Sequence, residues 1–400
     1  MKKSENSVSD IFKARALPRK RISSLFSQKE SSISVTASQN IPLGGQRAKY
    51  YPPAIDVGST SIKLLQLAKT SRGYEIAKIA FSPLEKSAKT LVDLKAPLKS
   101  LVKENKLRGE IVGVLPLSLM QVYNFFLPEM PEAEIEQAVI WKLKQNPPQG
   151  MPFGSFSFDF IYFGQSESSL TNEIRVILFV ASKVTVMERI NFFKEVSLEL
   201  VAMEPEPYAI FSSLMWLGKI KLEETVIVLQ LGAKESSILI IHSGQPFLMR
   251  NLASTGNAMT EAVASFNHCD WSKAEAIKKQ EGIKNWKTDG LPEGGMPSGS
   301  ALSGPLENLV LDVDQSFKLF SQQLKKKQMV SFHRLSLCGG ASSLLNLDKF
   351  LADRLEVPVD VFNPLDSPNY YSQQEMHPLI IANSSRFPSA LGSAVRNIEW

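Results

Sequence analysis

The sequence predicts an α/β protein made of two related halves, and three segments of the chain carry this prediction. Residues 54–65 run from a β-branched stretch through a small polar turn at Gly58 into a second apolar stretch, which is typical of a β-hairpin. Residues 226–241 repeat this layout around Gly232, 174 residues after Gly58. Farther on, residues 335–344 run from a strand into two consecutive glycines. The order and spacing of these segments indicate that the second half repeats the plan of the first.

The turn of the first hairpin has the chemistry of an anion site. Gly58 lets the backbone come close to a ligand, and Ser59, Thr60 and Ser61 offer hydroxyl and N–H groups. Successive backbone N–H groups in such a turn form an anion-binding concavity. Asp56 lies at the edge of the turn, where its carboxylate can hold the waters of a Mg²⁺ ion. An ordinary hairpin with polar turn residues explains this segment equally well when it is taken alone.

Composition fits two domains in a reducing compartment. Four hundred residues with 44% hydrophobic content suffice for two domains, each with its own core. No apolar run approaches the roughly 18 residues that a membrane-spanning helix needs. Cys269 and Cys338 lie in very different contexts, which argues against a disulfide framework. The four histidines show no metal-ligand spacing, so we do not expect a zinc site.

Residues 1–50 are predicted to be a disordered, basic, Ser-rich tail. They contain ten Lys/Arg and three Asp/Glu, a balance of +7, whereas the remaining 35 bases and 37 acids give −2. With few aromatics and no sustained period, such a segment cannot bury enough apolar surface to stay ordered. Residues 11–17 and 19–21 leave open a contact with an anionic membrane or a partner, and we favour the solvated tail.

Strands and helices alternate after the first hairpin, as an α/β architecture requires. We expect a strand over residues 74–81, a helix over 95–105 and a strand over 110–115. In the second half, residues 285–305 hold five glycines and three prolines without apolar periodicity. They are predicted to be a mobile loop between helices near 274–280 and 306–327.

A small α+β insert is expected at about residues 114–182. Its first strand covers residues 121–127, and Pro131 then opens a helix with acidic residues in its early turns. Proline is tolerated at the start of a helix, and acids suit the positive end of its dipole. Two prolines end this helix, and strands over 156–160 and 173–182 follow. The first of these strands alternates phenylalanine with other residues, so its aromatics share one face.

Short motifs spread over about residues 53–396 resemble one family. They are Leu127-Pro128, Glu134, Trp141, Pro147, Asp159, residues 178–183, residues 204–209, Gly232-Ala233, Gly244, Gly256, residues 337–340, residues 357–359, Asn363-Pro364 and residues 390–392. Together with the hairpins, they resemble the type IV pilus assembly protein family PilM. FtsA and the cytoplasmic domain of GspL are relatives of similar design.

The resemblance implies an actin/Hsp70-type two-domain nucleotide-binding fold, with ATP in the cleft between the domains. The first actin-like domain would span residues 51–222 and carry the inserted subdomain at about 114–182. The second would span residues 223–400 and carry the mobile loop at about 285–305.

The resemblance also implies which residues contact ATP and Mg²⁺. Asp56, Gly58, Ser59, Thr60 and Lys63 match the first phosphate hairpin, with Asp56 reaching Mg²⁺ through water. The other matching positions are Gly232 and Ala233 in the second hairpin, Gly256, Glu275 and Lys278 for ribose and adenine, and Gly339 and Gly340 in the adenosine-facing turn.

Two of these assignments carry alternatives or departures. Glu275 and Lys278 lie three residues apart on one helix face, so a simple ion pair explains them equally well. Glu206, with Glu204 beside it, matches the position of a water-orienting catalytic group. Gln230 stands where the family pattern has an Asp in the second hairpin. A neutral amide gives a metal-bound water a weaker hydrogen bond than a carboxylate does, so we expect nucleotide binding with hydrolysis that is slow at most.

The function implied by the resemblance is a cytoplasmic ATP-binding scaffold of a type IV pilus or type II secretion assembly. It would lie at the cytoplasmic face of the inner membrane without spanning it, and it would bind other assembly components but no nucleic acid. Its partner would be the cytoplasmic N-terminal peptide of a PilN-like inner-membrane protein, held between the first domain and the insert. The alternative is a sugar or carboxylate kinase of the same superfamily, which the absence of an evident sugar-binding run disfavours.

Overall fold

The computed structural model describes residues 48–164, 173–283, 301–324, 331–372 and 375–398. The predicted tail up to residue 47 and residues 285–300 of the predicted loop therefore lie outside the described residues. The tail ends earlier than residue 50, and the loop ends earlier than residue 305. Strand β1 (Lys49–Tyr50) already pairs with β3, and helix α9 begins at Ser303. Among the described residues, no helix has the length and apolarity that crossing a bilayer requires.

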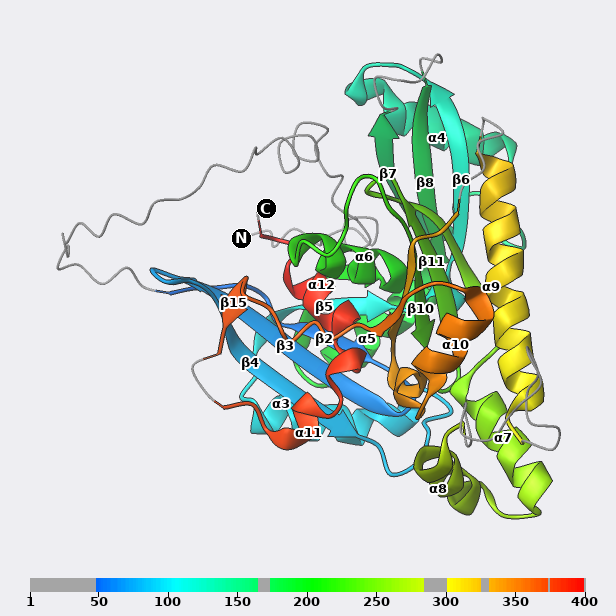
Figure 1. Ribbon diagram of the computed structural model, residues 1–400. Helices are drawn as coiled ribbons and strands as arrows, with labels where there is room; N and C mark the ends of the chain where they lie inside the picture. The colour runs from blue at the N-terminus through cyan, green and yellow to red at the C-terminus, as the bar shows by residue number, and fades with distance from the viewer. Residues whose placement is uncertain (1–47, 165–172, 284–300, 325–330, 373–374, 399–400) are drawn as a thin grey trace, which may run out of the picture.

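The first half is built on a seven-stranded sheet of order β15-β4-β3-β2-β5-β9, with β1 paired to β3 (Figure 1). The predicted hairpin forms its centre, because β2 pairs antiparallel with β3 and parallel with β5. The strands are β2 (Ala54–Val57), β3 (Ser61–Thr70), β4 (Gly73–Pro83), β5 (Gly109–Leu115), β9 (Leu198–Pro205) and β15 (Tyr370–Tyr371). The helices of this half are α3 (Lys95–Glu104), α5 (Lys183–Lys194), α6 (Glu206–Trp216), α11 (Pro378–Ile381) and α12 (Pro388–Ala394).

The second half repeats this plan on a five-stranded sheet of order β12-β11-β10-β13-β14. Strand β10 pairs antiparallel with β11 and parallel with β13, as β2 does with β3 and β5. The two related halves expected from the hairpins are therefore confirmed. The elements are β10 (Thr225–Leu231), β11 (Ser236–His242), β12 (Gln245–Leu252), β13 (Arg334–Cys338), β14 (Val359–Val361), α7 (Gly256–Asn267), α8 (Trp271–Glu281), α9 (Ser303–Gln323) and α10 (Leu347–Leu355).

The predicted insert is a three-stranded sheet of order β6-β8-β7 with one helix on it. Its elements are β6 (Gln121–Pro128), α4 (Glu132–Gln145), β7 (Phe156–Gly164) and β8 (Glu173–Ser182). Ile135, Val139 and Leu143 of α4 pack on one face of this sheet, as their helical spacing predicts. Phe156 is buried in the same cluster.

The aromatic residues of the insert contribute mainly to its own core. Phe125, Phe158 and Phe160 are half-buried and pack against the insert's own core rather than against the first half. The opposite face of the sheet carries Ile177 and Phe179, which enter the main core of the molecule. A sheet buried on both faces needs more apolar residues than a sheet with one wet face.

The C-terminal part of the chain returns to the first half. Strand β15 pairs with β4, and α12 packs against α6 and against the centre of the first sheet (Figure 1). Residues beyond about 370 thus lie with the first sheet, although the sequence assigned everything after residue 222 to the second half. This return carries Ser389 of α12 to within hydrogen-bond distance of Asp56 in β2.

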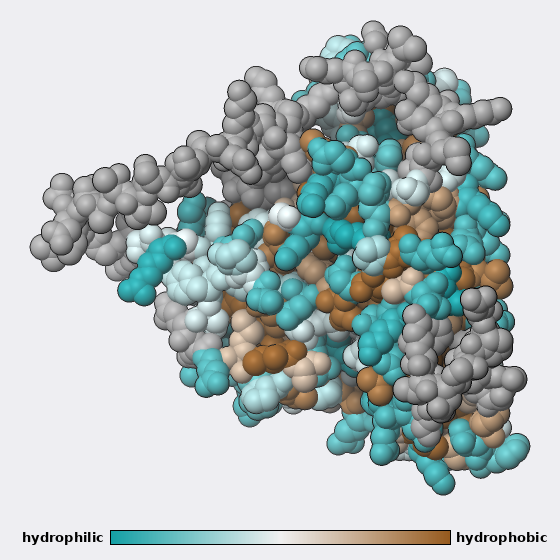
Figure 2. Space-filling model, in the orientation of Figure 1, coloured by the Kyte–Doolittle hydropathy of each residue, from teal (hydrophilic) through white to brown (hydrophobic). Residues whose placement is uncertain are grey.

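The outer surface mixes residue types. On the face shown in Figure 2, hydrophobic side chains form patches that hydrophilic ones interrupt. Leu379 and Ile381 of α11 are examples of apolar residues with substantial exposure. Scattered apolar residues of this kind are normal on protein surfaces.

Candidate nucleotide site

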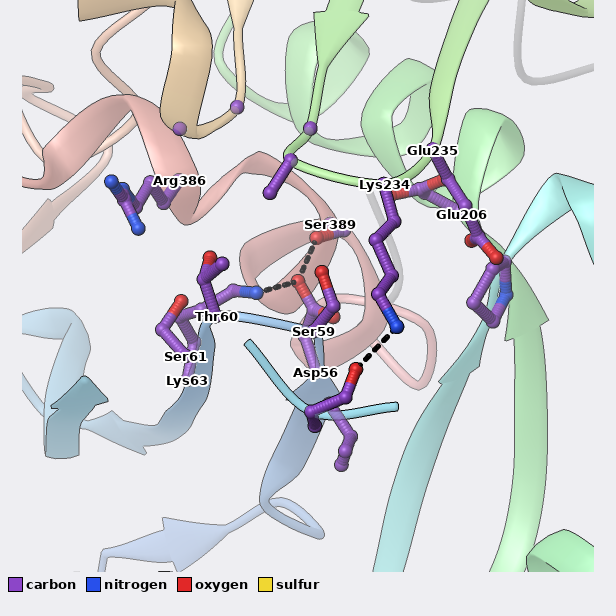
Figure 3. A pocket seen from close by; sticks show the side chains of 18 of the residues that line it. Asp56, Ser59, Thr60, Ser61, Lys63, Glu206, Lys234, Glu235, Arg386 and Ser389 are labelled. Carbon is purple, nitrogen blue, oxygen red and sulfur yellow. Dashed lines mark hydrogen bonds and ion pairs between the residues drawn. The ribbon is translucent and has the colours of Figure 1, made fainter. Parts of the chain in front are cut away.

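A cavity of about 360 Å³ lies where the two halves meet, and both predicted hairpins open into it (Figure 3). The first half contributes the turn after β2, the loop around Ala88, and residues of α5 and α6. The second half contributes the turn after β10 and the end of β13, and the returning C-terminal segment closes one side. The cavity is therefore assembled from segments that span almost the whole described chain.

The first turn is fixed by its own hydrogen bonds. The Gly58 N–H donates to the Ser61 carbonyl at 3.0 Å, and the Ala88 N–H donates to the Ser59 carbonyl at 2.7 Å. A Cβ at Gly58 would lie 3.1 Å from Lys63 Nζ, so a side chain there would crowd the lysine. Gly58 thus allows the lysine ammonium to lie across the turn.

Asp56 has two partners in the cavity. Its Oδ2 lies 2.9 Å from Lys63 Nζ and accepts a hydrogen bond from Ser389 Oγ at 2.6 Å (Figure 3). Both Asp56 and Lys63 are buried. The negative charge that the sequence assigned to a Mg²⁺ contact is therefore balanced by a cation of the same hairpin.

The start of helix α7 holds the second turn in place through backbone hydrogen bonds. The Gly256 and Asn257 N–H groups at the start of α7 donate to the Gly232 and Ala233 carbonyls at 2.9 and 2.8 Å. A Cβ at Gly232 would overlap the Glu235 carbonyl, so this tight turn requires glycine. Thr255 caps α7 by accepting a hydrogen bond from the Ala258 N–H.

Lys234 crosses from the second hairpin to the first half. Its Nζ donates to the Ala88 carbonyl at 2.5 Å (Figure 3). Ala88 also holds the first turn through Ser59. The lysine therefore links the two hairpins on opposite sides of the cavity, and its ammonium lies between them.

The double glycine forms a third wall. Gly339 has φ 90°, and a Cβ there would lie 2.5 Å from the Leu231 carbonyl oxygen, so only glycine is free of strain at this position. Its N–H donates to the Ser385 carbonyl at 2.8 Å. A Cβ at Gly340 would come within 3.0 Å of the Arg386 guanidinium carbon. Arg386 therefore packs directly against this turn.

Glu206 lines the cavity at the start of α6. Burial, with the nearby Asp56 and Glu235 charges as smaller causes, raises the pKa of its carboxyl to about 8. At neutral pH this carboxyl is mostly protonated, and it then makes a poor base for a water molecule. Glu204 is buried in β9 and contacts Arg396 instead of lining the cavity.

Two arginines bring further positive charge to the cavity wall. Arg189 comes from α5, and Arg386 follows the returning strand β15 and rests on the Phe81 ring. Burial lowers the pKa of both guanidinium groups, and nearby carboxylates oppose this shift. An arginine with a lowered pKa in a cavity wall is stabilised by an anion beside it.

The structure brings ten of the predicted residues to the cavity and leaves three outside it. Those in the wall are Asp56, Gly58, Ser59, Thr60, Lys63, Glu206, Gly232, Ala233, Gly339 and Gly340. Gly256, Glu275 and Lys278 lie behind it. Glu275 pairs with Lys278 at 2.7 Å, and Lys278 Nζ donates to the Gly256 carbonyl at 3.0 Å. These contacts join α8 to α7, which matches the ion-pair alternative left open by the sequence.

The wall residues that were not identified from the sequence include Arg189, Lys234, Arg386 and Ser389. Lys234 and Ser389 lie next to predicted motifs, within the second hairpin and just before residues 390–392. Their closeness to these motifs is the only feature of the sequence that points to them. Arg189 gives no signal, because only the packing of α5 brings it to the cavity.

The wall fits nucleotide phosphates better than it fits a protein-bound metal ion. Turn N–H groups and five cationic side chains offer donors to anionic oxygens. For Mg²⁺ the same wall offers Asp56, which is already paired, the carboxyl groups of Glu188, Glu206 and Glu235, and the neutral amide of Gln230. Among the described residues, no three His, Cys, Asp or Glu side chains are grouped so that they could hold a metal ion. The metal contact of Asp56 stays a prediction, and the local donor set does not favour it.

Comparisons with known proteins agree with this architecture. The model of the family described as type IV pilus assembly protein PilM matches residues 54–398. A solved structure of a PilM–PilN type IV pilus biogenesis complex is 22% identical and has a TM-score of 0.70. The alignment covers 88% of this chain and 99% of that chain, which shows the same fold.

More distant structures also align. The ethanolamine utilization protein EutJ from Carboxydothermus hydrogenoformans is 14% identical, with a TM-score of 0.47 and coverage of 88% of this chain and 92% of that one. MreB5 of Spiroplasma citri bound to ADP is 13% identical, with a TM-score of 0.42 and coverage of 88% and 99%.

Proposed function

This chain belongs to the type IV pilus assembly protein PilM family, and from that premise we propose that it is an ATP-binding scaffold. It serves a type IV pilus or a related type II secretion assembly at the cytoplasmic face of the inner membrane. There it binds the cytoplasmic N-terminal peptide of a PilN-like membrane protein. The observation that carries this proposal is the family match over residues 54–398, which includes the whole insert.

ATP binding is supported by the cavity between the halves. Two hairpin turns, the Gly339–Gly340 turn and several cations converge on a space of about 360 Å³. Helix and turn N–H groups next to cations are the usual protein partners of phosphates. The size and donor pattern of the cavity therefore suit a nucleotide.

Slow hydrolysis at most is supported by Glu206 and Gln230. Glu206 is the predicted catalytic residue, and its raised pKa keeps it protonated at neutral pH. Gln230 lines the cavity without a negative charge, so it cannot hold a metal-bound water as strongly as a carboxylate would. A scaffold fits such a site better than a kinase does, and no feature of the described residues favours the kinase alternative.

Partner binding is supported by an open strand edge on the insert. Among the described residues, β7 pairs with β8 on one side, and Figure 1 shows its other side at the margin of the insert. The Phe160 N–H donates to its neighbour Asp159 Oδ1 at 2.8 Å instead of to β8, so it points toward this edge. Phe158 lies two residues earlier, so its N–H has the same direction. An extended peptide can pair with such an edge.

A proline at this edge tests the partner proposal. We expect Phe158→Pro to abolish binding of a peptide from the N-terminus of the PilN-like protein, measured by fluorescence anisotropy, because proline removes the outward N–H. Phe158→Ala is the matched control, since it loses the same ring and keeps the N–H. Circular dichroism of both variants checks that they are folded. Equal peptide binding by the Pro and Ala variants would place the peptide elsewhere.

A further inference from the structure

We propose that this site holds the phosphates of ATP or ADP mainly through fixed side-chain cations, so that nucleotide affinity does not depend on a divalent metal ion. The inference rests on the proposed nucleotide binding and concerns how the same site balances the phosphate charge. Lys234 is the cation that we expect to contribute most.

The first step of the argument is the state of the carboxylate nearest to the phosphate turns. Asp56 Oδ2 already accepts from Lys63 Nζ at 2.9 Å and from Ser389 Oγ at 2.6 Å. A hydrated Mg²⁺ ion would have to compete with both donors at Oδ2, and at Oδ1 it would meet a carboxylate whose charge Lys63 already balances. The carboxylate is thus used to hold Lys63 in the turn.

The second step is the chemistry of Gln230. This residue faces the cavity from the end of β10, and its buried Oε1 has no hydrogen-bond partner among the described residues. Its amide NH₂ can donate to a phosphate oxygen, which a carboxylate cannot do. A Gln at this position therefore has an NH₂ group that can donate to an anion, which an Asp lacks, while its Oε1 remains an uncharged acceptor.

The third step is the excess of positive charge. Within the described ranges, no carboxylate lies at ion-pair distance from Lys234, Arg189 or Arg386. Glu188 and Glu235 are exposed, as Lys234 is, and they offset part of the charge of Arg189, as Glu275 does for Arg386. An anion in the cavity would give these cations a closer counter-charge than the carboxylates around them provide.

Lys234 lies between the two turns that we expect to bind the phosphates. It belongs to the second turn, and its Nζ reaches the Ala88 carbonyl next to the first turn. An ammonium about 4 Å from a phosphate oxygen in a partly buried site changes affinity by about tenfold or more. A cation held between both hairpins neutralises part of the phosphate charge, as a bound Mg²⁺ ion does.

The experiment is a calorimetric titration of the full chain with ATP and with ADP, each in Mg²⁺ buffer and in EDTA. For the wild type we expect dissociation constants that differ by less than about threefold between the two buffers. Lys234→Gln should weaken binding by about tenfold in both buffers, because it removes the charge and keeps the length. Gln230→Asp should make binding Mg²⁺-dependent, with a loss of about tenfold in EDTA.

Lys273→Gln is the control, since Lys273 is exposed on α8 outside the cavity and its loss should leave both constants unchanged. The inference is overturned if EDTA weakens wild-type binding by tenfold or more, or if Lys234→Gln binds like the control. In those cases the proposed nucleotide binding still stands. No heat of binding in either buffer would overturn both.

Discussion

Glu206 changes its chemical character because folding places its carboxyl in the cavity wall. An exposed glutamate is ionised at neutral pH, whereas burial raises the pKa of this one to about 8. The unfolded chain therefore binds fewer protons than the folded chain between about pH 4.5 and pH 8. Stability contributed by this residue falls as the pH rises through that window and is constant above it.

Glu206→Gln should remove this pH-dependent cost. We expect the variant to gain about 1–3 kcal/mol of unfolding free energy relative to the wild type when the pH is raised from 5 to 8. Urea unfolding of both proteins at the two pH values measures the difference. Parallel pH profiles for the two proteins would show that Glu206 is ionised in the folded state.

At the residue scale, sequence analysis identified side chains that lie within short motifs. Asp56 and Lys63 face each other across one hairpin, so their proximity follows from local register. Ser389 binds Asp56 from 333 residues away, and no local pattern announces such a pair. Glu275 and Lys278 were assigned to the nucleotide through the family resemblance, and their spacing on one helix face also predicted the ion pair that is observed.

At the scale of elements, the contact between α6 and α12 is set by one glycine. A Cβ at Gly392 of α12 would overlap the carbonyl group of Ala209 in α6. Two helices approach this closely only where one lacks a side chain at the crossing. The same contact positions Ser389, three residues earlier, against Asp56.

Gly392→Ala should therefore destabilise the protein by about 2 kcal/mol or more, since the buried helix must move to admit a methyl group. Gly304→Ala is the matched control, because a Cβ at Gly304 in α9 meets no atom within 4 Å. We expect the control to lie within about 0.5 kcal/mol of the wild type. Thermal unfolding measures both, and similar midpoints for the two variants would contradict the tight crossing.

Sequence analysis identified the elements themselves well because their signals are local. The expected strand over 110–115 and helix over 95–105 differ from β5 and α3 by one residue. Helix α9 was expected to begin after Pro305, whereas it begins at Ser303 and includes that proline in its first turn. Proline is accepted there because the first helical N–H groups have no partner to lose.

At the scale of the whole molecule, one face of the second sheet joins the core of the first half, and the other face has a core of its own. Val226 and Val228 of β10 and Ile241 of β11 belong to the same buried cluster as Ile55 and Leu64 of the first sheet. The sequence predicted two domains, each with its own core, and the second half does have a separate cluster around Ile227 and Leu229. The shared part was not predicted, because composition counts apolar residues and does not say which sheet faces meet. Helix α6, buried along its whole length, fills the space between the sheets.

The insert is also attached to the second half, through Arg175 of β8. Its guanidinium donates to the Pro246 carbonyl at 2.8 Å and to Gln245 Oε1 at 3.0 Å, at the start of β12. It also lies 4.5 Å from the centre of the Phe247 ring. Burial lowers the pKa of this arginine to about 9, so it keeps its charge at neutral pH. The insert, which we propose as the partner-binding part, is thereby joined to the half that carries the second hairpin.

Arg175→Met should loosen this attachment while keeping most of the apolar packing. The variant loses two hydrogen bonds and a cation–π contact, and it leaves the Pro246 carbonyl without this donor, so we expect a loss of about 1–3 kcal/mol. Hydrogen exchange of residues 245–252 should become faster, because β12 is the outer strand of the second sheet and its first residues lose their hydrogen bonds to Arg175. Arg72→Met, at an exposed turn, is the control that should leave this exchange unchanged. If β12 exchanges at the same rate in both variants, other contacts hold the insert to the second half.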